Sequence, residues 1–587
     1  MIVKLARLEF DHGNGPALHI RQDGETPVAP DFGAYALATT DQRRMTLLTE
    51  FAFEQQPGVA PPPKIDIRAL AVSPALGVLG DVSPVSVPVP AAGNTSGPIL
   101  VKLSAARLQE AGVGRYDVSW DWRFRSPGSS AWVPFGRSVH VVYVTLNAPG
   151  PPWTQATDAA SQRRWPWTRL LEFACEWGSG VTLASGLDVA SRRIASKIET
   201  AIFSLGEQEV FAYALGSDAN LITGTTIRRF KATRFVRVVE GQVGERPLAV
   251  TCQECAAAVG VVSNLLGADL KRVTVRRKDN LMMDLNRIIA IGRRRSSPQF
   301  RFHEIMIRIS QAGAKQVFDG CLQPDWETNL KNDVSDFRLT QGRRLGALRL
   351  NPNATTYLQR LLEPDKPLWK QVEVVDNAMP CLDTCAPDAQ PDVESDTLKS
   401  IFRQQIDSIA PAIPTVSAVP PVIRSFNFAG FRLYKQVDSM SHLAELGDLV
   451  ALYAGFAYTA YRPDQRGADY DPNRRFRISV GWSPTVSAAR DALAWLMTLN
   501  DAPLTRLKTA DRKRLGDAAF ATPGHRAVFL VRGNAFARIV STGSKLLPMG
   551  PIAERIDRAM VKLMRASPAQ LSASLGVPNG STPNPRN

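Results

Sequence analysis

The stretches that decide the fold are TCQECAAAVGVVSNLLGADL (residues 251–270) and FRFHEIMIRISQAGAKQVFDG (residues 300–320). The first has the pattern of a helix, because Thr251 and Glu254 form a T-x-x-E capping box before an apolar run and Gly267 provides a stop. The second has apolar, strand-like runs on both sides of the turn QAGAK, which predicts two strands joined by a hairpin. We expect the rest of the chain to pack around this helix and hairpin.

The predicted helix contains two cysteines, and its expected start separates them. If Thr251 is the N-cap, Cys252 is the first helical residue, where the helix dipole and the unpaired backbone N–H groups favour a thiolate. Cys255 lies one turn further along, and with Val259 and Val262 it forms an apolar stripe typical of a buried helix face. Because apolar surroundings keep a thiol protonated, we interpret Cys252 as the candidate nucleophile and Cys255 as a core residue.

The predicted hairpin supplies a candidate base and a candidate acid. Alternation along RFHEIMIRI (301–309) puts His303 on one strand face with the isoleucines that follow at every second position. Such a histidine is often only a core residue, but Asp319 is expected opposite a residue between 303 and 307, within side-chain reach. An aspartate there can fix the imidazole tautomer and stabilise the imidazolium. Asp319 also suits a simpler role as a turn residue before Gly320.

This order of a cysteine, a histidine and an aspartate resembles the transglutaminase-like superfamily. The family's loose cysteine motif, C-x-[DE]-x-A, stands here as CQECA (252–256), its histidine strand as FHE (302–304) and its aspartate strand as VFD (317–319). The resemblance covers about residues 165–330, and the tryptophan that the family often carries beside these motifs is missing.

The resemblance implies a papain-like α+β core with Cys252 as nucleophile, His303 as base and Asp319 as orienting acid. The leading expectation is a hydrolase of a peptide or amide bond, of the protease or amidase type. A protein-modifying enzyme, either a transglutaminase that transfers the acyl group to an amine or a deamidase, including one that acts as a leaderless exported effector, is the first alternative. A catalytically inactive transglutaminase-like scaffold or binding protein is the second. The backbone N–H of Cys252 is one expected oxyanion donor, and Gln242 and Gln253 are candidates for the second. We expect no cofactor and no metal.

The composition fits this class of protein. A chain of 587 residues with 44% hydrophobic and 21% charged residues is ordinary for a multidomain soluble protein. It has no apolar run long enough for a transmembrane helix, and Glu9 and Asp11 interrupt the start before a signal-peptide core can form. Six cysteines are too few for a disulfide framework. These observations predict a cytoplasmic protein, with export by a leaderless route as the alternative.

The net charge of +15 allows two interpretations. Basic residues gather at 227–237, 270–278 and 292–295. They indicate either an acidic partner surface or, more simply, solvated strand faces. No nucleic-acid-binding module accompanies the charge, so the expected partner is a protein or peptide substrate and not a nucleic acid.

Composition and patterning divide the chain into five predicted parts. These are a β-rich, β-sandwich-like region (1–150), a transglutaminase-like catalytic domain (151–375), a Pro-rich linker (376–424), a C-terminal α+β domain (425–566) and a disordered tail (567–587).

Several smaller features complete the predictions. The segment 83–98 is expected to be a low-order linker. Cys175 and His140 are interpreted as core residues. Cys381 and Cys385 lack a second Cys or His pair nearby, so they do not predict a zinc site. Helices are expected at 165–180, 188–206, 484–499 and 549–564, and a hairpin turn at Gly533-Asn534.

Overall fold

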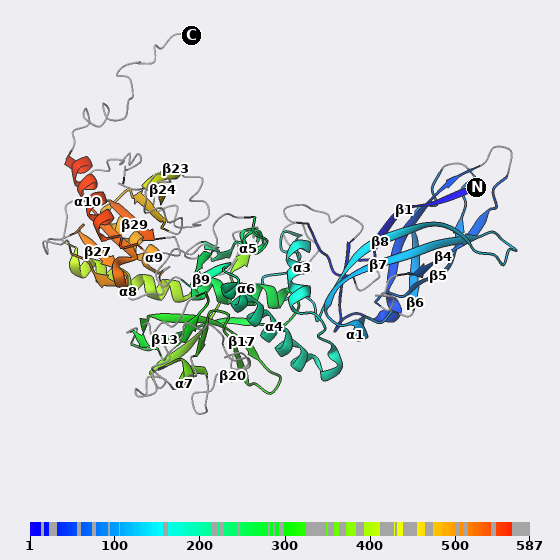
Figure 1. The fold of residues 1–587 in the computed structure, drawn as a ribbon, viewed down its shortest axis with the longest axis horizontal. Helices are drawn as coiled ribbons and strands as arrows, with labels where there is room; N and C mark the ends of the chain where they lie inside the picture. Colours follow the sequence, from blue (N-terminus) through cyan, green and yellow to red (C-terminus); the bar gives the residue numbers. More distant parts are fainter. Residues whose placement is uncertain are drawn as a thin grey trace, which may run out of the picture.

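A computed structural model shows an α+β protein in which strands predominate and three sheets have five or more described strands (Figure 1). The predicted α+β class is confirmed. No helix among the described residues is both long and apolar enough to cross a membrane. The structure describes residues 1–565 apart from 13–16, 23–31, 56–59, 73–77, 92–93, 105, 156–161, 214–220, 224–227, 243–246, 280–281, 286–287, 293–298, 325–347, 350–356, 363–370, 383–392, 411–427, 429–430, 438–454, 464–473, 499, 501–503, 509–514 and 542–546.

The N-terminal region forms one sheet of eight described strands in the order β1-β3-β6-β5-β4-β7-β8-β2. The sheet nearly closes, because β1 at one end also packs against β2 and β8 at the other. The predicted β-rich region is therefore confirmed, although its strands form one curled sheet. The strands are β1 (Ile2–Phe10), β2 (Phe32–Ala36), β3 (Thr46–Glu54), β4 (Lys64–Ala71), β5 (Asp81–Pro88), β6 (Ile99–Ser104), β7 (Gly114–Arg125) and β8 (Val133–Thr145).

One local prediction in this region was wrong. The segment 83–98 was expected to be a linker, but most of its first half belongs to strand β5. The side chains of Val82 and Val87 are buried, and Val85 packs against the core. Pro84 and Pro88 are tolerated in this strand, so the proline content misled the prediction. His140 on β8 is buried against Phe10 and Trp120, in agreement with its interpretation as a core residue.

The central part consists of helices packed against a sheet with the order β20-β18-β17-β13-β21. Helix α6 (Cys252–Leu265) lies on one face of this sheet and contacts β13 and β17 (Figure 1). The predicted helices appear as α3 (Thr168–Trp177) and α4 (Leu187–Glu207), and both pack against α6. The strands are β13 (Lys271–Arg277), β17 (Phe302–Ile309), β18 (Lys315–Phe318), β20 (Leu348–Arg349) and β21 (Val372–Asn377).

Short elements surround this sheet. They are α1 (Leu108–Ala111), α5 (Ala232–Val239) and α7 (Tyr357–Leu361), with β9 (Phe211–Tyr213), β10 (Ile222–Thr223), β11 (Arg229–Phe230), β12 (Leu248–Val250), β14 (Met283–Asp284), β15 (Ile288–Ala290), β16 (Gln299–Phe300), β19 (Leu322–Pro324) and β22 (Cys381–Leu382).

The C-terminal part is a sheet of seven described strands in the order β23-β24-β25-β29-β28-β27-β26, flanked by α9 (Val486–Thr498) and α10 (Gly550–Arg565). Its helices and its hairpin turn at Gly533-Asn534 appear where the sequence predicts them. The strands are β23 (Phe431–Val437), β24 (Gly455–Pro463), β25 (Phe476–Trp482), β26 (Thr505–Arg506), β27 (Ala518–Ala521), β28 (Ala527–Arg532) and β29 (Ala535–Ser541).

The passage 376–424 is not a structureless linker, as its composition had suggested. It contains β22 and the helix α8 (Val393–Ile409), which packs on β21 and α9. The side chains of Phe402 and Ile406 are fully buried. The prolines that dominate the composition lie at 411–421, outside the described residues, as does the predicted tail 567–587. The division into five parts remains a prediction.

The register of β17 and β18 fixes the relative positions of the predicted site residues. Ile307 lies opposite Val317 and Met306 opposite Phe318. Continuing this register places Asp319 opposite Ile305, which is one diagonal step from His303. The expectation that Asp319 faces a residue between 303 and 307 is therefore confirmed.

Helix α6 runs in the opposite direction to β13, because only residues 266–270 connect them. Since β13 and β17 are antiparallel, α6 begins at the end of the sheet where β17 begins. A Cβ atom added at Gly260 would come within 2.5 Å of Met306 Cε. The middle of α6 therefore lies against the middle of β17. Cys252 therefore lies at the same end of the sheet as His303 and Asp319.

The packing of the end of α6 against Asn147 offers a separate test. Gly267 has φ +80°, and a Cβ atom there would lie 2.6 Å from the backbone oxygen of Asn147. We expect Gly267→Ala to lower the free energy of unfolding by about 2–4 kcal/mol, since left-handed strain and a backbone clash act together. Gly313→Ala is the matched control, because Gly313 has φ +76° but no atom near the added Cβ. Its expected cost is about 1 kcal/mol, and equal losses in urea denaturation of the two variants would contradict the packing shown here.

Candidate functional site

The start of α6 is held as the capping pattern predicts. The backbone N–H of Thr251 donates to Glu254 Oε2 at 2.8 Å, and the backbone N–H of Leu221 donates to the same carboxylate. The helix begins at Cys252, one residue after Thr251. The cysteine is thus placed at the first helical position, close to the positive end of the helix dipole.

Burial does not separate the two cysteines in the way the sequence suggested. All fourteen residues of α6 are buried, and the exposed fractions of Cys252 and Cys255 are 0% and 2%. The helix is enclosed by α3, α4 and the sheet, so it has no solvent face for Cys252 to occupy. The apolar-stripe argument for Cys255 as the core residue was therefore not selective, and only the position at the helix start distinguishes Cys252.

His303 and Asp319 form a direct pair. His303 Nε2 lies 2.8 Å from Asp319 Oδ2, and their side chains are 0% and 1% exposed. Because a carboxylate only accepts, Nε2 carries a proton and Nδ1 is the acceptor in the neutral ring. Among the residues that the structure describes, His303 Nδ1 has no hydrogen-bond partner. The pair therefore leaves one imidazole nitrogen available for a further proton transfer.

Asp319 is held by three additional donors. Its Oδ1 accepts from the backbone N–H groups of Cys321 at 2.9 Å and Leu322 at 3.1 Å. Its Oδ2 also accepts from the hydroxyl of Tyr357 at 2.7 Å. The backbone N–H of Asp319 in turn donates to Glu199 Oε1 at 2.7 Å. This arrangement fixes the carboxylate and, through it, the orientation of the His303 ring.

Cys252 belongs to the same cluster of ionisable groups. Burial raises the pKa of the Cys321 thiol well above its usual value, and a hydrogen bond with Cys255 and the nearby Asp319 and Cys252 raise it further. Burial also raises the pKa of the Tyr357 hydroxyl, with contributions from Asp319, Cys321 and Cys252. Cys252 is therefore within electrostatic range of the groups that hold Asp319.

The strand faces add a constraint that the sequence did not reveal. Met306 touches α6 at Gly260, so the alternation along β17 directs His303 to the opposite face, where Tyr357 of α7 contacts Asp319. Both faces of β17 are buried as far as Arg308, whereas Ile309 is 42% exposed, contrary to its expected place on the buried face. Cys252 thus begins α6 at the end of the sheet where β18 stops at Phe318, whereas His303 lies on the strand face that points away from the middle of α6.

Two of the basic residues around this site are internal. Arg228 and Arg272 are buried and pair with Glu304 at 3.0 Å and 3.5 Å. The sequence had suggested either an acidic partner or solvated strand faces for these clusters, and both interpretations were wrong for these two arginines. A carboxylate on β17 neutralises them inside the core, which no charge run could reveal because Glu304 lies far along the chain.

The two candidates for the second oxyanion donor differ in their exposure to solvent. Gln242, after α5, is exposed, whereas Gln253 is 1% exposed and its Nε2 has no hydrogen-bond partner among the described residues.

No group of three or more His, Cys, Asp or Glu side chains placed to hold a metal ion is found in the described part of the chain. Cys385 lies outside the described residues.

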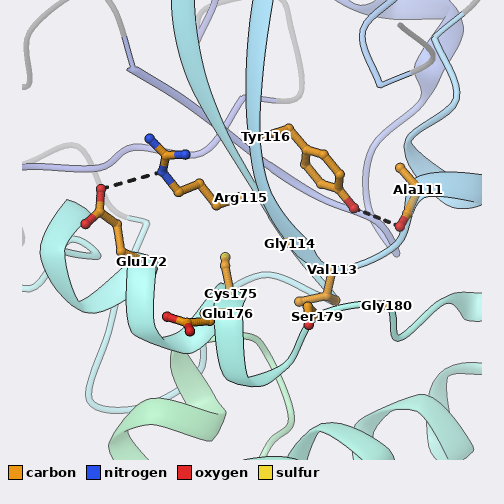
Figure 2. Close-up of a pocket in the computed structure, with 10 residues that line it drawn as sticks. All are labelled: Ala111, Val113, Gly114, Arg115, Tyr116, Glu172, Cys175, Glu176, Ser179 and Gly180. Atoms are coloured by element: carbon orange, nitrogen blue, oxygen red, sulfur yellow. Dashed lines mark hydrogen bonds and ion pairs between the residues drawn. The ribbon is translucent and has the colours of Figure 1, made fainter. Parts of the chain in front are cut away.

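A cavity of about 560 Å³ lies elsewhere, between β7 and α3 (Figure 2). Arg115 and Glu172 approach each other across it at 3.7 Å, and Cys175 contributes to its wall. Burial raises the pKa of the Cys175 thiol to about 12, so this cysteine stays protonated. It is fully buried, as the sequence predicts, and the cavity is not a second thiol site.

Sequence reasoning missed Glu199, Cys321 and Tyr357. Glu199 lies on the buried side of α4, and Tyr357 lies on the five-residue helix α7, so neither has a motif that connects it to Asp319. Cys321 could have been noticed from its position two residues after Asp319. A short spacing of this kind lets a backbone N–H reach the aspartate side chain, as it does here.

Comparisons with known proteins add little to this picture. No protein-family model matches the chain, and no curated protein matches it in sequence. One similar solved structure is the crystal structure of red sea bream transglutaminase. The TM-score is 0.26 and the sequence identity 11%, over 84% of this chain and 75% of that chain. A TM-score this low carries no argument. The functional interpretation therefore depends on the residues of the cluster around Asp319.

Proposed function

We propose that the central unit is a thiol-dependent acyl-transfer site, with Cys252 as nucleophile, His303 as general base and acid, and Asp319 as the group that orients His303. The observation that carries the proposal is the buried His303–Asp319 pair, whose open Nδ1 lies at the sheet end where α6 begins. A cysteine at a helix start, an imidazole and an oriented carboxylate are the parts that thiol catalysis needs.

The proposed reaction has two steps. The thiolate of Cys252 attacks an amide carbonyl carbon, the C–S bond forms, and the C–N bond breaks as His303 gives its proton to the leaving amine. Water then attacks the thioester, its proton passes to His303, and the C–S bond breaks to release a carboxylic acid and restore the thiolate. The carboxylate of Asp319 accepts from Nε2 throughout the cycle, and it stabilises the imidazolium that His303 forms in the free enzyme and again when water gives up its proton.

The oxyanion that forms in each step needs two donors. The backbone N–H of Cys252, at the first position of α6, is one. Gln253 is favoured over Gln242 as the second, because it directly follows Cys252 and its amide nitrogen is buried without a partner among the described residues. A buried amide N–H without an acceptor is costly, and a developing oxyanion would supply that acceptor.

Acylation by an activated ester tests the proposal without knowledge of the natural substrate. After incubation with p-nitrophenyl acetate, we expect mass spectrometry to find a hydroxylamine-sensitive acetyl group on the peptide that carries Cys252. Cys175→Ser should retain this label, since the Cys175 thiol is buried and held protonated. The Cys252→Ser variant should lose the thioester. Absence of the label on wild-type Cys252 would contradict the proposal.

The same experiment separates hydrolysis from transfer. Hydrolysis is the leading expectation, and it predicts that the thioester decays at a rate independent of added amine. If a lysine analogue accelerates the decay and appears as a stable amide, the site is a transferase.

A second candidate is a scaffold or binding protein that retains this fold without catalysis. Two observations favour it: Cys252, His303 and Asp319 are all at most 2% exposed, and His303 lies on the strand face opposite to Met306 and the middle of α6. This candidate predicts no thioester at Cys252 and reactivity equal to that of the other buried cysteines.

A further inference from the structure

The guanidinium of Arg301, close in sequence to His303, is buried and has no counter-ion among the described residues. Arg301 directly precedes β17, two residues before His303, and is 7% exposed. Its guanidinium carbon lies 4.3 Å from the centre of the Phe402 ring on α8. Its Nε has no hydrogen-bond partner among the residues that the structure describes. Burial lowers its pKa to about 10, and no acidic group contributes to the shift.

Other arginines at or next to this sheet are paired with carboxylates. Arg228 and Arg272 share the carboxylate of Glu304. Arg276 and Arg277, at the neighbouring end of β13, pair with Glu373 at 2.6 Å and with Asp279. A buried cation without a partner is strongly unfavourable, so a fold that neutralises its neighbours and leaves Arg301 alone indicates that something else supplies the anion.

We propose that Arg301 binds a carboxylate of the acyl substrate, so that the site acts on carboxylate-bearing peptides or amides. This inference rests on the proposed function of Cys252. A guanidinium stacked on an aromatic ring presents its N–H groups in a fixed plane, which suits two parallel hydrogen bonds to a carboxylate. Lysine, a point charge without that plane, would hold the anion less specifically.

Two alkylating reagents of similar size test the charge preference. Iodoacetate carries a carboxylate and iodoacetamide is its neutral analogue, so the ratio of their rates at Cys252 reports attraction of an anion. We expect Arg301→Gln to lower this ratio by at least about tenfold, because the loss of even one of the two charge-assisted hydrogen bonds has that effect. Arg301→Lys should lower it by less. Arg277→Gln is the matched control, because Arg277 ends the neighbouring strand but is already paired with Asp279, and its ratio should stay within about twofold of the wild-type value.

The outcomes separate the two proposals. If Cys252 reacts with neither reagent faster than Cys175, the thiol site itself is wrong. If Cys252 reacts quickly but Arg301→Gln and Arg277→Gln change the ratio equally, the anion site is wrong and the thiol site stands. Circular dichroism should show that Arg301→Gln is folded, since removing an unpaired buried charge relieves a desolvation penalty.

Competition by peptides identifies the source of the carboxylate. A capped tripeptide with a central glutamate offers a side-chain carboxylate, and an uncapped tripeptide with a central glutamine offers a C-terminal one. One of these peptides should slow iodoacetamide alkylation of Cys252 in the wild type but not in Arg301→Gln. That peptide carries the carboxylate that Arg301 binds. If neither protects better than the capped glutamine peptide, the proposal is overturned.

Discussion

His303→Ala is expected to slow alkylation of Cys252 by iodoacetamide at pH 5 by about 30-fold. An isolated thiol with a pKa near 8.5 is only ~0.03% thiolate at pH 5, whereas a thiolate paired with an imidazolium is almost fully ionised there. The paired thiolate is intrinsically about 100-fold less nucleophilic, because nucleophilicity falls with basicity. The ionisation gain is roughly 3,000-fold, and dividing it by the loss of about 100-fold gives the expected net effect of about 30-fold.

The same reasoning predicts that the two pH profiles cross. Above roughly pH 6.5 the unpaired thiol of the variant is ionised enough for its greater nucleophilicity to prevail, so His303→Ala becomes the faster protein. His140→Ala is the matched control, since His140 is also a buried strand histidine but contacts Phe10 and Trp120 in the N-terminal sheet. Parallel profiles for the wild type and His303→Ala would show that the imidazole does not act on the thiol.

Asp319→Ala is expected to destabilise the central sheet by about 3–5 kcal/mol. The carboxylate accepts from His303, Tyr357 and the backbone N–H groups of Cys321 and Leu322, and the substitution leaves all of these donors buried without an acceptor. Asp319→Asn should cost less, because its amide oxygen can still accept from the two backbone groups.

Hydrogen exchange measures this loss where it occurs. The amides of Cys321 and Leu322 should exchange faster in Asp319→Ala, and the amides of β17 should lose protection by the same free energy if the sheet opens as a unit. Asp66→Ala is the comparison, because Asp66 forms a half-exposed pair with Arg125 and should cost less than about 1 kcal/mol. Similar losses in the two variants would mean that Asp319 is an ordinary strand-end residue.

The sequence was most informative where local rules decide the structure. The capping box predicted the start of α6 at Cys252 to the residue, and the turn QAGAK predicted the hairpin that sets Asp319 one diagonal step from His303. Gly267 ends the helix with a positive φ, as expected. Each of these features depends on residues within a few positions of one another, so the sequence contains the whole cause.

The parts that sequence could not predict depend on tertiary packing. The burial of α6 on every side comes from α3, α4 and the sheet together, so a stripe within the helix could not indicate it. Glu199 and Tyr357 reach Asp319 from elements 120 and 38 residues away. Arg228 and Arg272 belong to basic runs in the sequence, and only the fold brings the carboxylate of Glu304 to both of them. The Pro-rich composition of its surroundings gave no indication of α8, because the apolar face of this helix is apparent only from its contacts.

The pH profile of Cys252 alkylation in the wild-type protein is the most direct test of the thiol site. Cys175, Cys252, Cys255 and Cys321 are all at most 2% exposed, so access is matched and the rates compare thiolate content. The account predicts that Cys252 reacts at a rate nearly independent of pH between about 5 and 7, while the other three rise about tenfold per pH unit. If Cys252 instead rises in step with Cys175, the proposed pairing of Cys252 with His303 is wrong.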